Sequence, residues 1–300
     1  MSRGTGWQVA TPARRAVLFV NPRSGGGTAQ RARIAEHARE RGIDAVVLQP
    51  DQSLSKLVGE AVAGGADALG MAGGDGSLAV VAEAARRHDL PFVCIPAGTR
   101  NHFAGDLGIR RDDPIGALAA FTDGAESRID VGEVNGRMFL NNVSLGIYGD
   151  AVRQPAYRDA KLRTLLKTAD AVRTSTAEAP QLRLADDRGR EHVRPAVVLV
   201  SNNAYVPGPP VGGLRPALDR GQLGIIVIDA PGRGKPSTAW TAPSLEVLAE
   251  APVHAGVDGE NVDLDPPLRF VIKPTALRVR ISSRDAAAAS SPQVARARRR

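Results

Sequence analysis

The chain has 300 residues, a formal net charge of +7 at pH 7, and 43% hydrophobic and 24% charged residues. This length suits two domains or one large domain, and no unbroken apolar run reaches the roughly 18 residues expected of a membrane-spanning helix. A basic surface can attract nucleic acid or an anionic bilayer; because the sequence has no nucleic-acid-binding motif and only 4% aromatic residues, we expect a bilayer and no nucleic acid.

The N-terminal residues 1–12 lack the apolar segment of a secretory signal peptide. Cys94 is the single cysteine, so the chain cannot form an internal disulfide, which fits a reducing cytoplasm. Cys94 lies in an apolar stretch and is interpreted as a small core residue rather than a nucleophile. We therefore expect a cytoplasmic protein that associates peripherally with the inner face of the membrane.

Residues 15 to about 125 alternate apolar strands with helical patterns. Strands are expected near 15–20, 44–49, 66–72 and 91–96, and helices near 28–41, 53–64, 77–87 and 112–123. This alternation predicts a parallel sheet with helices on its faces, and hence an α/β domain over residues 15–125.

From Arg128 onward the pattern changes to strands separated by turns. These strands are expected near 128–134, 137–144, 181–186, 192–201, 223–229, 252–257 and 268–272. They predict a second, antiparallel β-sandwich domain over residues 126–283, which makes the fold class α/β plus β. A helix expected at 157–172 carries an apolar stripe that would pack into the core or, alternatively, form a lid facing lipid.

The two ends of the chain, residues 1–14 and 284–300, are expected to be disordered. The last segment ends in several arginines, which are either a solvated tail or a weak electrostatic anchor. Edge strands of the second domain could pair between copies, so a homodimer stays open.

A glycine-rich or polar turn follows three of the strands expected in the first domain. The turns are residues 21–27, 73–77 and 96–104. Because ligands bind at the carboxyl ends of strands in open α/β sheets, we expect the three turns to gather at one edge. Glycine lets a phosphate approach the backbone, and a helix N-terminus offers free N–H groups. Three ordinary strand–helix connections are the alternative interpretation.

The first two turns read NPRSGGG and GGDGS, and the third, continued to residue 108, reads PAGTRNHFAGDLG. Together they resemble the diacylglycerol kinase catalytic domain of bacterial soluble lipid kinases, a group related to sphingosine and ceramide kinases. Later segments extend the resemblance to about residues 15–283; they are IDVG at 129–132, FLNNVSLG at 139–146, GLRP at 213–216 and VDGE at 257–260. The GGDG element is shared with NAD kinases, but the third turn points to the lipid kinases.

The resemblance implies an active site in the cleft between a nucleotide-binding α/β domain and the sandwich domain. It also implies ATP- and Mg²⁺-dependent transfer of a γ-phosphate to the hydroxyl of a membrane lipid, with diacylglycerol as the expected acceptor. The first two turns would hold the ATP phosphates through backbone N–H groups. The residues expected at the nucleotide are Asn21, Pro22, Ser24, Gly25, Arg31, Gly73, Gly74, Gly76, Thr99 and Asn101.

Four carboxylates are the candidate catalytic residues. Asp75 would hold a phosphate-bound Mg²⁺, unless it is a helix cap. Glu260 would act as the general base that takes the proton of the lipid hydroxyl, and Asp258 would orient it or help bind metal. A solvated Asp-Gly turn is the alternative for this pair. Asp130 matches an acidic position of the family's cleft network, and an ordinary exposed strand residue is the alternative.

Cationic side chains must offset the triphosphate. Arg31 and Arg100 lie near the first and third turns, whereas Arg33 and Lys161 are better interpreted as solvated residues. His102 is interpreted as a hydrogen-bonding loop residue rather than a proton shuttle.

Two positions depart from the family pattern. Many relatives carry a lysine where this chain has Gly26, and Arg31 could compensate. A structural Mg²⁺ site in the second domain would use Asp219, but Arg220 replaces one of the paired acids, and its positive charge would repel the ion.

Three functions therefore compete. The first is the lipid kinase, which the GGDG and VDGE elements favour. The second is an NAD kinase-like small-molecule kinase, and the third is a non-catalytic nucleotide- or lipid-binding homologue, suggested by Gly26 and Arg220. The sequence leaves the identity of the lipid open, because the shape of an apolar pocket sets that choice.

Overall fold

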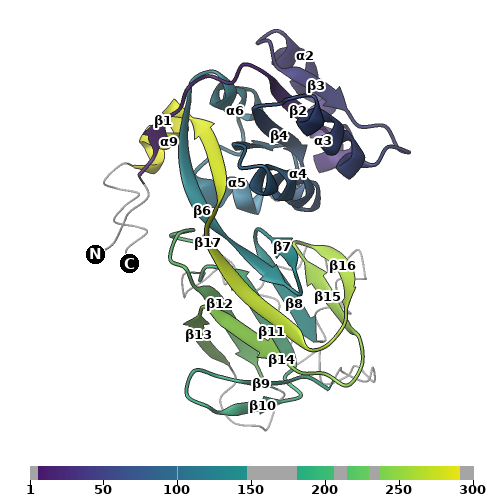
Figure 1. Ribbon diagram of the computed structural model, residues 1–300, viewed down its shortest axis with the longest axis vertical. Coiled ribbons are helices and arrows are strands. Elements are labelled where there is room, and N and C mark those ends of the chain that lie inside the picture. The colour runs from purple at the N-terminus through teal and green to yellow at the C-terminus, as the bar shows by residue number, and fades with distance from the viewer. Residues whose placement is uncertain (1–5, 100, 147–180, 206–214, 230–236, 291–300) are drawn as a thin grey trace. The chain divides into compact units, whose positions relative to one another are not determined.

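The computed structural model describes residues 6–99, 101–146, 181–205, 215–229 and 237–290 (Figure 1). Its contacts divide the chain into two compact units. The first unit combines residues 1–129 with residues 275–300, and the second comprises residues 130–274. The first unit is thus built from two separate stretches of the chain.

A parallel sheet forms the centre of the first unit. Its strands are β2 (Ala16–Val20), β3 (Asp44–Val47), β4 (Ala68–Gly73) and β5 (Phe92–Pro96), in the spatial order β5-β4-β2-β3. Every residue of β2, β4 and β5 is buried, which is typical of parallel strands that are covered on both faces. The parallel α/β fold predicted for this part of the chain is confirmed.

Helices follow these strands, all but one of them near the predicted ranges. They are α1 (Thr28–Arg31), α2 (Ile34–Arg39), α3 (Leu54–Ala63), α4 (Asp75–Arg87), α5 (His102–Leu107) and α6 (Pro114–Ala117). The exception is α5, which lies where the third turn and the segment after it were expected, so that His102 begins a helix rather than lying in a loop. α4 packs on β4 and β5, and α2 packs on β2 and β3. The helix expected over 28–41 is interrupted, because Arg33 takes a left-handed φ of 50° that ends α1 and starts α2.

The first unit is completed by the two ends of the described chain. β1 (Gln8–Val9) pairs with β6 (Gly124–Val134), and β17 (Leu268–Ser282) pairs in parallel with β5. α9 (Ser283–Ala289) follows β17 directly, and the side chain of Ser282 caps it by accepting a hydrogen bond from the Asp285 amide. The disorder expected over 1–14 and 284–300 is therefore wrong at residues 8–9 and 284–289, where backbone pairing or helix capping fixes the chain.

The contiguous boundaries expected for the two domains also differ from the structure. β6 enters the second unit at Asp130, and β17 leaves it after Pro274. Residues 275–283, expected in the sandwich domain, belong to the first unit because they extend the sheet beside β5.

The second unit is an antiparallel sandwich. One layer has the order β13 (Thr238–Ala242), β12 (Leu223–Ile228), β11 (Val197–Asn202), β8 (Asn142–Gly146), β15 (Val253–Val257) and β16 (Glu260–Leu264). The other layer contains β7 (Arg137–Phe139), β14 (Ser244–Val247) and the portions of β6 and β17 in this unit. Buried side chains from both layers form one core, in which the rings of Phe139 and Phe270 meet edge to face at 6.5 Å.

A short hairpin of β9 (Arg183–Ala185) and β10 (Glu191–Val193) adds Leu182 and Leu184 to this core. The helix expected at 157–172 lies outside the described residues. Among the residues that are described, no helix is long and apolar enough to cross a membrane.

Candidate active site

Three turns meet at the carboxyl edge of the parallel sheet. β2, β4 and β5 are neighbours in register, with Val20 beside Ala72 and Gly73 beside Pro96, so all three strands end at the same level. The chain leaving β2 stays attached to β4, since the Asn21 amide donates to the carbonyl of Ala72 at 2.9 Å. The gathering of the three turns predicted from the sequence is thus observed.

The turns touch one another so closely that two of their glycines leave no room for a side chain. A Cβ on Gly25 would lie 2.6 Å from the Ala97 carbonyl oxygen, and a Cβ on Gly98 would lie 2.8 Å from the Gly74 Cα. The first and second turns therefore both pack directly against the third. A Cβ on Gly26 or Gly74 would meet no atom within 4 Å, so the space above these two backbones is open.

The first turn has an unusual backbone. Gly25, Gly26 and Gly27 have φ values of 58°, 64° and 90°, a left-handed run that glycine adopts at little cost. Position 26, where many relatives carry a lysine, has a backbone conformation in this chain that would strain any L side chain. Ser24 opens the short 3₁₀ turn of residues 24–26, and Pro22 precedes it as a half-buried residue.

The asparagines of the first and third turns bond within their own turns. Asn21 Oδ1 accepts from the Arg23 amide at 3.1 Å. Asn101 has a left-handed φ of 50°; its Oδ1 accepts from the Gly98 amide at 2.8 Å and its Nδ2 donates to the Gly98 carbonyl at 2.9 Å. These side chains shape the turns, while Thr99 stands exposed at the tip of the third turn.

Asp75 is the first residue of α4 and is half-buried. The N-cap is Gly74, in an extended conformation, so Asp75 is not the capping residue itself. A carboxylate in the first turn of a helix is stabilised by the positive end of the helix dipole. Burial raises the pKa of the neighbouring Cys94 thiol well above its usual range, and the charge of Asp75 adds to that rise. Cys94 is thus a buried, protonated core residue.

The donor chemistry of this edge fits Mg²⁺ with phosphates. Mg²⁺ prefers oxygen ligands and in phosphate-transfer enzymes is held by one or two carboxylates together with the phosphates. Asp75 supplies a carboxylate, and the open backbones of Gly26 and Gly74 leave room for phosphate oxygens beside it.

Of the four cations considered from the sequence, the structure describes the side chain of Arg33 alone. Arg31 ends α1, and its side chain lies outside the described part of the chain, as do Arg100 and Lys161. Arg33 is exposed, as the sequence predicts. His102 is an exposed residue at the start of α5.

In the second unit, Asp258 is a buried carboxylate in the turn between β15 and β16. It is only 8% exposed, and its oxygens accept from the amides of Leu140 at 2.7 Å, Asn141 at 2.7 Å and Asn142 at 3.1 Å. A solvated turn residue is therefore excluded for Asp258. Glu260 begins β16 two residues later with a side chain 56% exposed, 3.8 Å from the guanidinium of Arg137.

Asp130 is fully buried, so the exposed strand residue considered from the sequence is excluded. Its Oδ2 accepts from the Gly221 amide at 2.7 Å and from Asn203 Nδ2 at 3.1 Å. Asn203 Oδ1 in turn accepts from the Arg220 amide at 2.9 Å. Asp130 thus anchors the turn that contains Asp219.

A structural Mg²⁺ site at Asp219 stays a prediction. Within the described ranges, no three His, Cys, Asp or Glu side chains gather where they could hold a metal ion. Asp219 is half-buried and is followed by the exposed Arg220. We therefore assign no step to a metal at this position.

Sequence reasoning did not assign a role to three polar residues that are buried close to Asp130 and Asp258. Asn202, Asn203 and Arg215 are each no more than 1% exposed. Asn202 Nδ2 donates to the Asp130 carbonyl at 2.8 Å. The available signals were the GLRP segment, which contains Arg215, and two adjacent asparagines at the end of an apolar strand.

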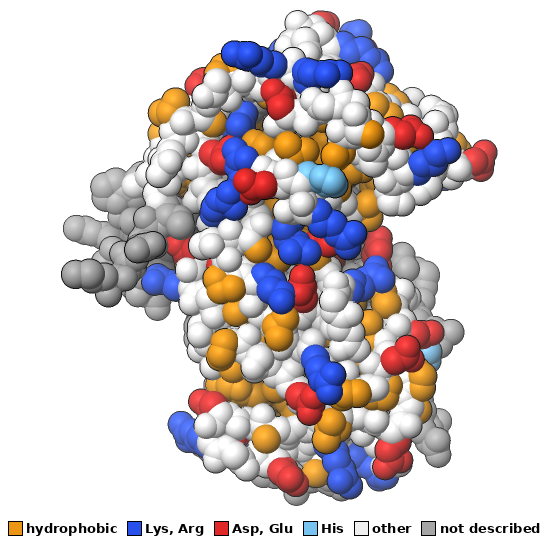
Figure 2. All heavy atoms as spheres, viewed as in Figure 1, with side chains coloured by type: hydrophobic (Ala, Val, Ile, Leu, Met, Phe, Trp, Pro, Cys, Tyr) orange, Lys and Arg blue, Asp and Glu red, His pale blue; other side chains and the backbone are white. Residues whose placement is uncertain are grey.

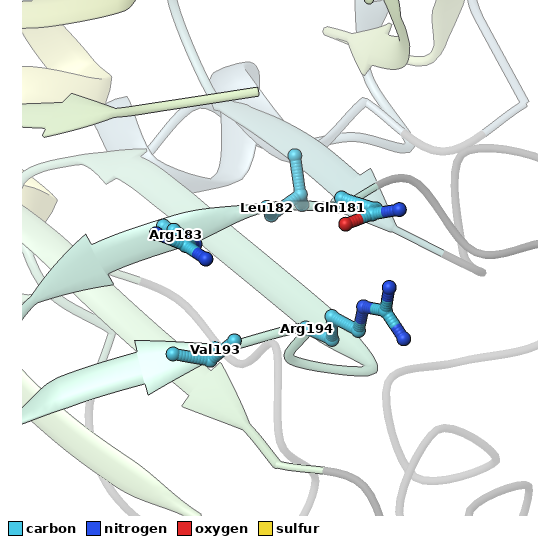
Figure 3. Close-up of a pocket in the computed structure, with 5 residues that line it drawn as sticks. All are labelled: Gln181, Leu182, Arg183, Val193 and Arg194. Atoms are coloured by element: carbon cyan, nitrogen blue, oxygen red, sulfur yellow. The ribbon is translucent and has the colours of Figure 1, made fainter. Parts of the chain in front are cut away.

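A separate pocket of about 220 Å³ lies at the β9–β10 hairpin (Figure 3). It is lined by Gln181, Leu182, Arg183, Val193 and Arg194. None of the residues predicted for the site lines this pocket.

Comparison with known proteins decides the family. The family described as "Diacylglycerol kinase catalytic domain" matches residues 15–134. A Pseudomonas aeruginosa protein named "Probable lipid kinase YegS-like" is 31% identical over 288 residues, which cover 88% of this chain and 93% of that protein. The chain belongs to the diacylglycerol kinase family. By family it is therefore a kinase of the lipid kinase group, that is, a phosphotransferase.

Two further proteins with diacylglycerol kinase in their names are similar to this chain. A Mycobacterium tuberculosis protein named "Diacylglycerol kinase" is 34% identical over 120 residues, 39% of each chain. A crystal structure of a diacylglycerol kinase from Bacillus anthracis matches with a TM-score of 0.64 at 19% identity, covering 92% of this chain and 99% of that one. At that identity the solved structure shows the shared fold alone.

Proposed function

We propose that the protein is an ATP- and Mg²⁺-dependent lipid kinase that transfers the γ-phosphate of ATP to the hydroxyl of a membrane lipid, with diacylglycerol as the first candidate acceptor. The observation that carries this proposal is the packing of the three turns, in which Gly25 and Gly98 leave no room for a Cβ. The turns would present backbone N–H groups and Asp75 at one sheet edge, an arrangement suited to a triphosphate.

Asp75 and the backbone of residues 21–27 and 73–76 would bind the nucleotide. Asp75 would hold a phosphate-bound Mg²⁺, whose chemistry there would be to neutralise the charge that develops on the phosphate oxygens. Asn21 and Asn101 accept hydrogen bonds from the Arg23 and Gly98 amides, so their contribution would be to fix the backbone of the first and third turns. Fixed donors stabilise transition-state charge without reorganising during the reaction.

Glu260 is the proposed general base. Its exposed carboxylate would take the proton of the lipid hydroxyl as that oxygen bonds to the γ-phosphorus, while the bond from phosphorus to the β–γ bridging oxygen breaks and ADP leaves. Asp258 would act indirectly, since its carboxylate is engaged by three backbone amides and lies two residues before Glu260.

The proposed partner is the anionic surface of a membrane, on the inner face of which the protein would act peripherally. The net charge of +7 supports an electrostatic attraction. Figure 2 shows Lys and Arg side chains interspersed with Asp and Glu on the face in view, so on that face the attraction would not come from a patch of one sign.

The test is transfer of labelled γ-phosphate from ATP and Mg²⁺ to a mixed lipid extract. We expect wild type to form a labelled lipid and Glu260→Gln to slow its formation by about 100- to 10 000-fold, the usual contribution of a general base. Asp75→Ala should abolish it. Glu246→Gln, which removes an exposed carboxylate on β14, is the control and should match wild type.

The same assay includes NAD as an alternative acceptor. Labelled NADP without any labelled lipid would assign the chain to NAD kinase-like chemistry and overturn the proposal. Binding of ATP with no product in any arm would favour a non-catalytic homologue instead.

A further inference from the structure

Arg215 is a buried arginine that bonds to the turn of residues 140–142 and to the last residue of β11. It is 1% exposed, and its Nη1 donates to the carbonyls of Leu140 at 2.6 Å and Asn202 at 2.7 Å. Its Nη2 donates to Asn141 Oδ1 at 3.0 Å. The planar fork of a guanidinium suits several acceptors at fixed angles, which the ammonium of lysine does not reproduce.

The turn of residues 140–142 is also held from its amide side. Asp258 accepts from all three amides of this turn, those of Leu140, Asn141 and Asn142. A buried cation thus bonds the Leu140 carbonyl and the Asn141 side chain of the turn, while a buried carboxylate bonds the amides of the turn. The 140–142 turn joins β7 to β8 and is fixed by opposite charges on its two polar sides.

The hydrogen bonds to Asp258 fix the turn that precedes Glu260, the first residue of β16. Asp258 has a left-handed φ of 49° and is followed by Gly259 at 86°, after which Glu260 pairs with Val257 across the β15–β16 turn. The Asp258 amide donates to the Asn142 carbonyl at 3.0 Å, so its backbone and its side chain are both tied to the 140–142 turn. A left-handed aspartate persists where surrounding bonds over-determine it.

Stability alone is a weak reason for this arrangement. Buried charged groups can often be replaced by apolar residues of similar volume with little loss of stability, or with a gain. A buried guanidinium with several fixed bonds instead specifies one geometry. We propose that Arg215 is a positioning residue that fixes the 140–142 turn, hence Asp258, and hence the direction of Glu260. This inference rests on the proposed function, because it takes Glu260 as the general base.

The test compares Arg215→Met and Arg215→Lys with wild type in the full-length protein. Arg183→Met is the matched control, since it removes the same charge from an exposed position on β9 in the same unit. Three readouts are needed: hydrogen exchange of the Leu140, Asn141 and Asn142 amides, kcat and KM for ATP with the lipid acceptor, and the pH dependence of kcat.

For Arg215→Met we expect faster exchange of the three amides and a fall in kcat on the order of 100-fold, as for a small misplacement of a reacting group. KM for ATP should be unchanged, since the proposed nucleotide-binding turns belong to the first unit. The apparent pKa on the acidic limb of the kcat profile should move. Arg183→Met should match wild type in all three readouts.

If Arg215→Met does not fold, Arg215→Lys decides the test. An Arg215→Lys variant that unfolds like wild type but has a reduced kcat supports the inference. An Arg215→Lys variant with wild-type kcat and wild-type amide exchange overturns it. Wild-type kcat in a folded Arg215→Met would also overturn it. Glu260→Gln separates the two proposals. If Glu260→Gln keeps the wild-type kcat, Glu260 is not the general base, and both the proposed base and this inference are overturned. If Glu260→Gln is inactive but Arg215→Met is fully active, only the positioning role of Arg215 is overturned.

Discussion

At the scale of single residues, Gly98 shows why the three turns need glycine. An added Cβ would lie 2.8 Å from the Gly74 Cα and 3.1 Å from the Gly73 carbonyl oxygen, and backbone atoms cannot turn aside as a flexible side chain can. We expect Gly98→Ala to separate the second and third turns and to lower the free energy of unfolding by about 1–3 kcal/mol, the usual cost of overpacking. Urea unfolding measures the loss.

Gly74→Ala is the matched control for this substitution. Gly74 has a φ of −87°, which alanine can adopt, and an added Cβ would meet no atom within 4 Å. Its free energy of unfolding should stay within about 0.5 kcal/mol of wild type, as for substitutions away from packed positions. Equal losses in both variants would mean that contact between the turns does not require Gly98.

At the scale of elements, Glu126 links β6 to its neighbour in the sheet, β17. It bonds Arg278 Nε at 2.8 Å and Arg280 Nη2 at 3.1 Å. Burial alone would raise the pKa of Glu126, but the hydrogen bonds and charges of the two arginines outweigh it and hold the pKa below its ordinary 4.5. A carboxylate with a lowered pKa stabilises the fold above its unfolded pKa, and that contribution is lost as the pH falls through the folded value.

We therefore expect Glu126→Gln to lower the free energy of unfolding at pH 7 by about 1–3 kcal/mol, because it leaves the buried Arg280 with a weaker partner. The difference from wild type should shrink as the pH falls below 4.5. Urea unfolding at pH 7 and at successively lower pH measures both effects. Glu246→Gln, which breaks an exposed pair with Arg269, should change stability by less than about 1 kcal/mol. A pH-independent loss in Glu126→Gln would contradict the ion-pair origin.

Elements set by local patterns could be predicted from the sequence. The apolar runs that became β2, β4 and β5 are buried throughout, and each is followed by the expected turn. α9 was missed because its alanine-rich sequence resembles a tail; what defines it is a cap by Ser282 and an ion pair between Arg284 and Asp113 at 2.7 Å. Pairing across 171 residues leaves no local pattern.

The candidate site likewise combines features set by local patterns with features set by contacts between distant segments. The glycine turns were predictable, because φ and close backbone approach select glycine directly. The roles of Arg215 and Asn202 were not, because both bond mainly to backbone carbonyls of distant segments, and a carbonyl has the same chemistry at every residue. A burial pattern could have singled out Arg215 only after its neighbours were placed.

At the scale of the whole molecule, the first unit depends on the end of the chain. β17 lies beside β5 in the sheet, with Val279 paired to Phe92 and Arg280 to Val93. Every residue of β5 is buried, so without β17 an apolar strand would expose its edge and its unpaired backbone groups. The first 129 residues should therefore not suffice for this unit, although they contain all its helices described here except α9.

A chain that stops after Pro274 tests this dependence, with a chain that stops after Ser290 as its control. The shorter chain loses the part of β17 that pairs with β5, together with α9, whereas the longer one keeps both. We expect the shorter chain to lose ATP binding and the helical far-UV circular dichroism of the first unit, because the apolar edge of β5 would drive aggregation. The longer chain should unfold at the wild-type temperature. A chain ending at Pro274 that still binds ATP and unfolds cooperatively would contradict this dependence, and would mean that β2, β3, β4 and β5 with their helices bury enough apolar surface to fold alone.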